Sequence, residues 1–421
     1  MRDILVFLIV FGSIPYILRN PVVGALMWVW ISVMSPHTQG WGFATTFPFA
    51  YIIAVCTLAS LVFTRQPRNL PTAAPVLALL AFTVWMNVTF PFSLYPEYAF
   101  PQYTRVMKIM LMTFVVAMVI KSKEDVRRLV WVLVISLGFY GVKGGIFTLR
   151  SGGGQRVWGP GATFIGDNNA LALALIMVIP LMYYLQQTST NKWVRRGLTA
   201  SILLSALAAL GSYSRGGLLA IVAMCGFMWL KSRKKLMVGS VLAAVGPALL
   251  LFMPQEWASR MDTIDNYQAD ASAMGRINAW YMAWNLARDR IFGGGFEIYE
   301  PATFAAYAPV PNDVHAAHSI YFQVLGEHGF GGLALYLLVG ITTWRTAAWI
   351  VKNAPKAPGM QWAVEMATMM QTSLMGFAVG GSFLSLTYFD VPYYLMCALV
   401  ATRVLVQANL PPPAPTMTRP G

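Results

Sequence analysis

Charged side chains are scarce in this sequence. Aspartate, glutamate, lysine and arginine make up 11% of the 421 residues, whereas 57% are hydrophobic and the mean hydropathy is +0.58. The apolar runs are long enough to cross a bilayer as helices, and they lack the alternating pattern of a membrane β-barrel. Because backbone polar groups in lipid must be satisfied within each helix, we predict an all-α polytopic membrane protein.

Cysteine is also rare, and the common nucleotide- and metal-binding motifs are missing. The three cysteines, Cys56, Cys225 and Cys397, lie within apolar runs, which favours a role in the core over metal binding. The glycine-rich stretch "RSGGGQRVWGPGA" (150–162) fits neither G-x-x-x-x-G-K-S/T nor G-x-G-x-x-G, so a flexible turn is its simplest interpretation. No basic helix or RNA-binding signature is present, which argues against a nucleic-acid partner.

Thirteen apolar segments are candidate membrane spans. The first two are short and are separated by Arg19-Asn20-Pro21, where proline ends one helix and restricts the residue before it. They form either a tight hairpin or one broken span, so we predict about 12 or 13 membrane-spanning helices. The candidates cover residues 4–18, 21–35, 47–64, 73–94, 104–121, 127–148, 168–187, 197–212, 215–231, 235–253, 319–344, 362–386 and 389–408.

Lysine and arginine concentrate in alternate short loops between these segments. The positive-inside rule places such loops in the cytoplasm, and this bias accounts for the net charge of +14. The loops near 150–166, 212–215, 254–317 and 386–389 then face the opposite, outer side, and the carboxyl terminus is cytoplasmic. The basic loops contain Arg65 and Arg68; Lys121, Lys123, Arg127 and Arg128; Lys192, Arg195 and Arg196; Lys231, Arg233, Lys234 and Lys235; Lys352 and Lys356.

The longest polar segment, residues 254–317, divides the chain into amino-terminal spans (1–253) and carboxyl-terminal spans with a short tail (318–421). We predict that this outer loop holds the catalytic or recognition element. Its middle, "AMGRINAWYMAWNLARDRIFGGG", predicts an amphipathic helix followed by a glycine stop, lying on the membrane surface or capping a cavity. The apolar residues at helical spacing are Ile277, Trp280, Tyr281, Trp284 and Leu286.

Several cations lie at an unexpected depth on the predicted outer side. Arg215 interrupts an apolar run within "SYSRGG", a tight polar junction that suits an anion. The guanidinium group matches phosphate oxygens bidentately, so several arginines facing one cavity would bind a diphosphate. Snorkelling to lipid headgroups is the alternative interpretation. The other cations of this group are Arg105, Lys108, Lys143, Arg150 and Arg156.

Three of the four histidines lie within "VHAAHSIYFQVLGEHGFGG", residues 314–332. His318 enters an apolar helix on the side where the cations collect, and its neutral imidazole is suited to remove a proton from a hydroxyl. His328 would lie near the opposite side of that helix. A zinc site made by Asp313, His315 and His318 lacks an established ligand spacing, so we predict no metal site. Glu327 is expected to be structural.

Three segments resemble motifs of the O-antigen ligase and polymerase superfamily. "HSIYFQVLGEHGFGG" resembles its histidine signature, "SYSRGG" its serine-arginine-glycine junction, and "GRINAWYMAWNLARDRIFGGGF" its outer-loop block. The amino-terminal third, which begins "MRDILVFLIVFGSIPYILRNPVVGALMWVWISVMSPH", resembles the subset called O-glycosylation ligases. The matching residues are His318, Gln323, Glu327, Gly329 and Gly332; Arg215; Arg276, Trp280 and Gly293 to Gly295.

Within this superfamily the sequence most resembles WaaL-type lipopolysaccharide O-antigen ligases. The resemblance implies a GT-C-like fold and transfer of a preassembled glycan from undecaprenyl diphosphate to lipid A-core, at the periplasmic face of a bacterial inner membrane. No metal or other cofactor is implied. His318 would be the catalytic base, and Arg215 and Arg276 would hold the diphosphate, with attack from the opposite face inverting the anomeric centre. Further candidate substrate-binding residues are Arg288, Arg156 and Lys143.

Other functions stay open at this point. An O-antigen polymerase, or a protein O-oligosaccharyltransferase that modifies serine or threonine, would share the same histidine and arginines. An anion transporter using Lys143 and the embedded arginines would belong to another class. Transport predicts inverted repeats and polar groups near the bilayer midplane, whereas this sequence shows no such repeat and its cations cluster toward one face.

Overall fold

The computed structural model describes residues 2–65, 69–232, 234–262 and 271–411, and no strand occurs within these ranges. Each of the thirteen predicted segments falls on one helix. These helices are α1 (Arg2–Arg19), α2 (Pro21–Met34), α3 (Phe49–Phe63), α4 (Ala74–Thr89), α5 (Pro96–Val119), α6 (Lys123–Arg150), α7 (Asn168–Thr188), α8 (Lys192–Gly211), α9 (Arg215–Lys231), α10 (Lys235–Phe252), α14 (Ile320–Asn353), α15 (Gln361–Gly380) and α16 (Val391–Ala408).

Eight of the helices in the described ranges are long and apolar enough to cross a membrane: α4 with the short helix after it, α5, α6, α7, α8, α10, α14 and α16. Helices α2 and α3 are apolar but shorter. The all-α polytopic class is therefore confirmed, and the count of 12 or 13 spans stays a prediction.

Several helices extend beyond the apolar segments from which they were predicted. Helix α6 begins at Lys123 because Ser122 and Asp125 form a capping box, in which each side chain accepts from the other residue's backbone N–H. Helix α5 begins eight residues before the predicted boundary, with Pro96 in its first turn. Hydropathy predicts the part of each helix that lies in lipid, whereas the capping residues determine where the helix itself begins.

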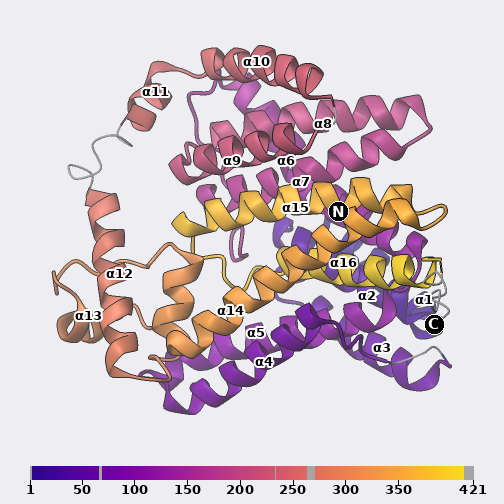
Figure 1. Ribbon diagram of the computed structural model, residues 1–421. Helices are drawn as coiled ribbons and strands as arrows, with labels where there is room; N and C mark the ends of the chain where they lie inside the picture. The colour runs from indigo at the N-terminus through magenta and orange to yellow at the C-terminus, as the bar shows by residue number, and fades with distance from the viewer. Residues whose placement is uncertain (1, 66–68, 233, 263–270, 412–421) are drawn as a thin grey trace, which may run out of the picture.

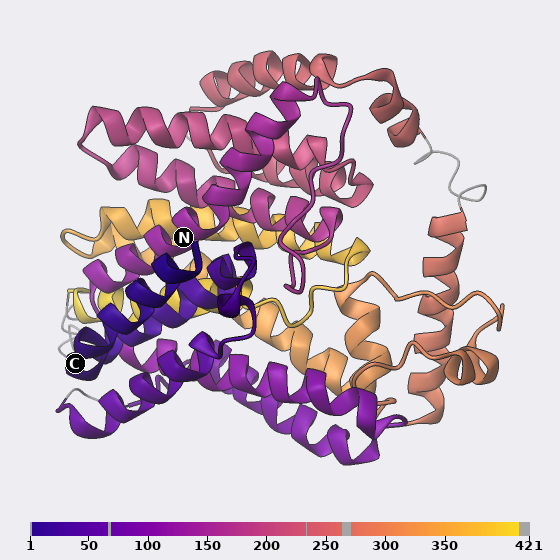
Figure 2. The same cartoon turned by 180° about the vertical axis from the view of Figure 1, so that it is seen from behind.

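The helices pack side by side in stacked layers (Figure 1). Helices α12 (Ala271–Asp289) and α13 (Pro301–Tyr307) lie together at one end of this bundle, here named the α12 end. Figure 2 shows the same end from behind, with the loop before α7 reaching into the space between the layers. The basic α7–α8 and α14–α15 connections lie at the opposite end. The basic loops and the long loop therefore occupy opposite ends, as the charge pattern predicted.

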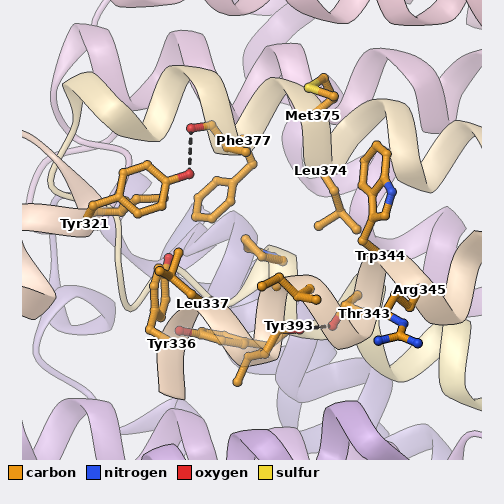
Figure 3. A pocket seen from close by; sticks show the side chains of 16 residues that line it. Tyr321, Tyr336, Leu337, Thr343, Trp344, Arg345, Leu374, Met375, Phe377 and Tyr393 are labelled. Atoms are coloured by element: carbon orange, nitrogen blue, oxygen red, sulfur yellow. Dashed lines mark hydrogen bonds between the residues drawn. The ribbon is translucent and has the colours of Figure 1, made fainter. Parts of the chain in front are cut away.

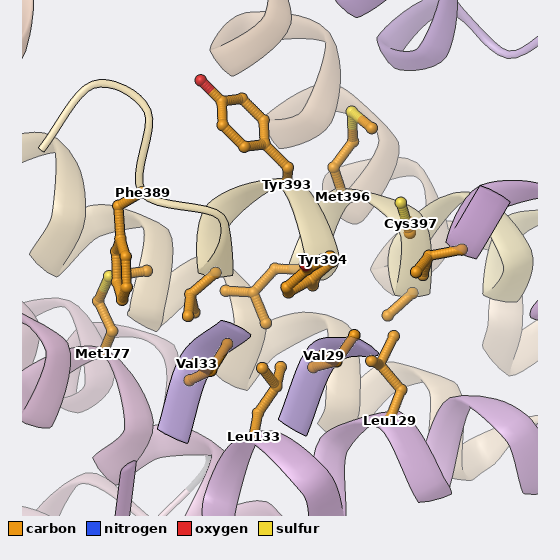
Figure 4. Close-up of a cluster of buried hydrophobic side chains, with 14 of the residues drawn as sticks. Val29, Val33, Leu129, Leu133, Met177, Phe389, Tyr393, Tyr394, Met396 and Cys397 are labelled. Atoms are coloured by element: carbon orange, nitrogen blue, oxygen red, sulfur yellow. The ribbon is translucent and has the colours of Figure 1, made fainter. Parts of the chain in front are cut away.

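Helix α7 is the most buried of the eight long apolar helices, with 89% of its apolar segment inside the protein. Helices α6, α8, α9 and α15 pack against it. On the side of α6, helices α2, α6 and α16 pack together through branched and aromatic side chains such as Val29, Leu133 and Tyr394 (Figure 4). Helices α6 and α8 approach closely at Gly145, where an added Cβ would lie 2.3 Å from the Leu204 carbonyl oxygen. Close backbone approach through small residues is a common way for membrane helices to associate.

Candidate active site

His318 lies two residues before α14, at the α12 end of the bundle. The Ser319 side chain begins the helix by accepting from the Phe322 N–H at 3.5 Å. The backbone of His318 is left-handed, with φ of +43°, a conformation that few residues other than glycine adopt and that is often found at functional sites. The half-buried imidazole is therefore carried by a strained stretch of backbone.

Helix α12 holds the segment that carries His318. Asn278 bonds to the start of this segment, donating to the carbonyl oxygens of Val310 and Asp313 at 2.9 Å each. The Trp280 indole N–H donates to the Ala317 carbonyl oxygen at 2.7 Å, and its ring stacks on Phe322 with centroids 5.0 Å apart. Trp280 thus fixes the backbone immediately before and after His318.

Helix α12 buries mainly small residues against its neighbours and leaves two of its aromatic residues exposed. Tyr281 and Trp284 are exposed, whereas the smaller Ala279, Ala283 and Leu286 are fully buried. Small residues allow the closer approach of α12 to α14, and the large aromatic residues are left on the outer surface. The apolar spacing therefore predicted the helix correctly, and whether its exposed aromatic face lies on the membrane surface stays a prediction.

Two charges lie close to the His318 imidazole. Burial lowers the pKa of His318 below its usual 6.5, and the positive charge of Arg276 on α12 lowers this pKa further. Asp167, the residue that caps α7, raises the pKa by a smaller contribution. The net shift is downward, so His318 is neutral at neutral pH and free to accept a proton.

Arg215 begins α9 on the other side of Asp167. The Ser214 hydroxyl caps this helix by accepting from the Gly217 N–H at 3.0 Å. Asn168, which follows Asp167, donates from its side chain to the Ser212 carbonyl oxygen at 2.6 Å. The amino terminus of α7 therefore links the arginine junction to the surroundings of His318, although the two lie about 100 residues apart in the sequence.

Arg156 lies over the same junction. Its guanidinium carbon is 5.7 Å from the centroid of the Tyr213 ring, and the Tyr213 hydroxyl donates to the Gly153 carbonyl oxygen at 2.7 Å. The Val157 N–H donates to Gly211 at 2.9 Å. The glycine-rich stretch connects α6 to α7, as predicted, and these hydrogen bonds dock it on the junction. Lys143 joins Arg156 in lining a pocket of about 300 Å³ beneath this stretch.

Arg288 is placed apart from the other candidates. It is exposed on α12, twelve residues beyond Arg276. Helical geometry puts the two residues about 18 Å apart along the axis and roughly 120° apart around it. The structure therefore brings Arg276 close to His318 and Arg156 close to the Arg215 junction, and it leaves Arg288 on the outer surface.

A buried polar network that the sequence did not reveal lies below His318. His328 bonds through Nδ1 to the Thr89 hydroxyl and through Nε2 to the Tyr388 hydroxyl, at 2.8 Å each. Tyr388 also donates to Glu327, which accepts from the Gln323 side chain at 3.3 Å. The network joins α4, α14 and the segment before α16, so Glu327 and His328 have structural partners.

The two glycine motifs meet each other at this network. Helix α14 is interrupted at Gly329, whose φ of +68° is not helical. The N–H groups of Gly294 and Gly295 donate to the carbonyl oxygens of Gly326 and Glu327 at 2.9 and 2.8 Å. Helix α12 ends earlier, at Asp289, so the predicted glycine stop instead docks this loop onto the break in α14.

An apolar pocket of about 360 Å³ opens between α14 and α15, beginning two residues after His318 (Figure 3). Ile320 and Tyr321 line its near end, and the Tyr321 hydroxyl donates to the Ala378 carbonyl oxygen at 3.0 Å. Phe377, Leu374 and Trp344 continue the lining along both helices. The pocket thus extends along α14 from Ile320, two residues after His318, as far as Arg345.

Taken together, the fold and the site define a polytopic membrane protein with a histidine and several arginines at one end of its helix bundle. Residues 200–337 match the O-antigen ligase family, and residues 1–190 match a family of unknown function, DUF5935. No curated protein matches the chain. The match to residues 200–337 includes Arg215, Arg276 and His318, and it supports the O-antigen ligase superfamily and ligase- or polymerase-type activity in general.

Proposed function

We propose that this protein is an inverting, metal-independent glycosyltransferase that moves a preassembled glycan from undecaprenyl diphosphate to lipid A-core. The observation that carries the proposal is the position of His318, neutral and half-buried beside Arg276 at the end of the membrane bundle. The match of residues 200–337 to the O-antigen ligase family supports it. The site would face the periplasm from the bacterial inner membrane, with the basic loops and the carboxyl terminus in the cytoplasm.

Each part of the site has a chemical role in this reaction. His318 takes the proton from the acceptor hydroxyl while that oxygen bonds to the anomeric carbon of the donor glycan. The bond between the anomeric carbon and the phosphate oxygen breaks, and undecaprenyl diphosphate departs. Arg276 and Arg215 stabilise the negative charge that develops on the diphosphate, and the nearby Arg156 and Lys143 add to the positive potential.

The membrane-embedded surroundings suit a lipid-linked donor. The apolar pocket between α14 and α15 begins beside His318 and accommodates the first isoprene units of a polyprenyl chain. A donor held there would have its diphosphate at the level of the arginines and its glycan outside the bundle. The proposal of a GT-C-like enzyme rests on this division between an apolar carrier site and a polar site for transfer.

Reconstitution tests the proposed reaction directly. Purified protein in proteoliposomes, given an undecaprenyl diphosphate-linked glycan and lipid A-core in buffer with a metal chelator, should form a glycosylated lipid A-core that shifts on a gel. Longer lipid-linked chains in the absence of lipid A-core would instead identify a polymerase. Transfer of the glycan to a serine-containing peptide would identify a protein glycosyltransferase. Solute uptake into vesicles without any glycosidic bond would refute the enzyme and favour a transporter.

The pH dependence of transfer should report the pKa of His318. Since only the neutral imidazole accepts a proton, the rate should fall with decreasing pH, around a midpoint below 6.5. Arg276→Gln removes a charge that lowers this pKa, so the midpoint should move to higher pH. Asp167→Asn removes a charge that raises it, so the midpoint should move to lower pH. Initial rates measured from about pH 4.5 to about pH 8 give the midpoint for each variant. If both midpoints moved in the same direction, the assignment of His318 as the base would be contradicted.

A further inference from the structure

A second polar pocket, of about 310 Å³, lies at the α12 end on the side of α2 and α5. Its walls come from these two helices, the turn after α2, the loop 162–165, and residues Phe389 and Asp390. Most of this wall belongs to residues 1–190, the part of the chain that matches a family of unknown function. The pocket shares no lining residue with the apolar pocket beside His318.

Two cations line this pocket. The Arg105 guanidinium carbon lies 3.7 Å from the centroid of the Phe164 ring, which holds the side chain in place from one face. Lys108 follows one turn later on α5, and both side chains are exposed to the pocket. The ion pairs of the described residues, Arg128–Asp125 and His315–Asp313, involve neither pocket cation, and Asp390 and Glu297 attract Arg105 without forming an ion pair with it.

Neutral polar groups complete the lining. Hydroxyl groups come from Ser32, Ser35, Thr38, Thr104 and Thr163. Among the buried polar atoms of the described residues, Nδ1 of His37 has no hydrogen-bond partner. A buried polar atom without a partner costs free energy unless a ligand satisfies it. These hydroxyls donate their hydrogens to acceptors within the protein, so their oxygens are left to accept from the hydroxyls of a sugar, and the two cations are the donors for an acidic group.

The carboxylates near the pocket do not fill it. Asp390 is only 1% exposed, and its Oδ2 atom accepts from the Ser32 hydroxyl and, at 3.1 Å, from the Tyr394 hydroxyl. These hydrogen bonds hold the Asp390 carboxylate within the lining of the pocket. Glu297 attracts Arg105 electrostatically but does not line the pocket. The exposed charged side chains of this lining are therefore Arg105 and Lys108.

Two segments of the chain connect the lining of this pocket with the surroundings of His318. The loop 162–165 lines the pocket, and Asp167, two residues later, lies near His318. Phe389 lines the pocket, and the nearby Thr387 hydroxyl donates to the Ile320 carbonyl oxygen at 3.1 Å, beside His318. Arg215 lies on the side of α7 and α9, so the donor diphosphate and this pocket approach His318 from different sides.

We propose that this pocket is the acceptor subsite and binds an acidic sugar residue, bearing a phosphate or a carboxylate, of the glycan that is extended. The proposal rests on the proposed function and adds the chemical class of the acceptor. The two cations bind the acidic group, and the hydroxyls and His37 bind its neighbouring sugar hydroxyls. The donor carries its negative charge on the diphosphate, whereas the acceptor would be selected through charge on its sugars.

Binding measured without transfer tests this subsite. The probe is core oligosaccharide released from lipid A by mild acid, used intact and in a neutral form with its phosphates removed and its carboxyl groups reduced. Detergent-purified full-length protein should bind the intact form about 10- to 100-fold more tightly, the range expected for hydrogen bonds to charged groups. Lys108→Gln and Arg105→Gln should each reduce this preference. Lys192→Gln, at the opposite end of the bundle, should keep it.

The outcomes separate the subsite from the proposed reaction. A preference that is absent in the wild type, or that survives both substitutions in folded protein, overturns the subsite. Loss of the preference when anionic phosphatidylglycerol vesicles are added, but not neutral vesicles, would show that the pocket holds a lipid headgroup and also overturns it. A preference that persists while reconstituted transfer fails would count against the reaction and leave the subsite standing.

Discussion

Replacing His318 by asparagine should reduce glycan transfer by about 10²- to 10⁴-fold, the contribution typical of a general base. Asparagine is the informative substitution because it tolerates the left-handed backbone that His318 adopts, with φ of +43°. Its amide has no basic nitrogen, so the variant removes proton acceptance while it preserves the local fold. Initial rates in proteoliposomes at saturating donor and acceptor measure the loss, and the melting temperature should stay close to that of the wild type.

His315→Asn is the matched control. This neighbouring imidazole pairs with Asp313 at 2.8 Å and leaves 44% of its side chain exposed. It contributes only weakly to the pKa of His318, so its replacement should retain most of the activity. Equal losses in the two variants would show that the segment needs its histidines for structure, and wild-type activity in His318→Asn would show that another group is the base.

The donor affinity distinguishes a base from a binding residue. If His318 acts on the acceptor hydroxyl, the turnover number should fall in His318→Asn while the Michaelis constant for the donor changes little, because the arginines still hold the diphosphate. A rise in the Michaelis constant with unchanged turnover would reassign His318 to substrate binding. The two constants therefore test its role, not only its importance.

Hydropathy was sufficient to predict the helices, because each apolar run in lipid has only one way to satisfy its backbone. It could not predict their ends or their neighbours. The capping box at Ser122 extends α6 beyond its apolar run, and no local signal marks α7 as the centre of the bundle. Packing depends on which small residues face each other, as Gly145 faces the Leu204 carbonyl oxygen.

The candidate site was predictable only in part, for the same reason. The sequence itself singled out His318 and Arg215, because a histidine and an arginine at the edge of apolar spans are chemically unusual, and the family resemblance added Arg276. Their partners carry no such mark: Asp167 resembles any helix cap, and Tyr388 resembles any interfacial aromatic residue. Tertiary packing brings them to the site from segments that are far apart in the sequence.

Gly329→Ala should destabilise the protein severely, since the break in α14 admits no side chain. With φ of +68° and ψ of −173°, Gly329 occupies a region that is essentially restricted to glycine. An added Cβ would lie 2.2 Å from the Ile291 carbonyl oxygen, and backbone cannot move aside as a flexible side chain would. We expect a cost of about 3 kcal/mol, which corresponds to a fall in melting temperature of roughly 3 to 4 °C in a chain of 421 residues.

Gly340→Ala, on the same helix, is the matched control. An added Cβ at Gly340 would have no neighbour within 4 Å, and alanine favours the helix by about 0.5 to 1 kcal/mol. Melting temperatures of the detergent-purified variants should therefore move in opposite directions. Since Gly295 donates to the Glu327 carbonyl oxygen across this break, Gly329→Ala should also displace the outer-loop segment that holds His318 and lower transfer. Equal melting temperatures for the two variants would mean that the break at Gly329 is not required by the fold.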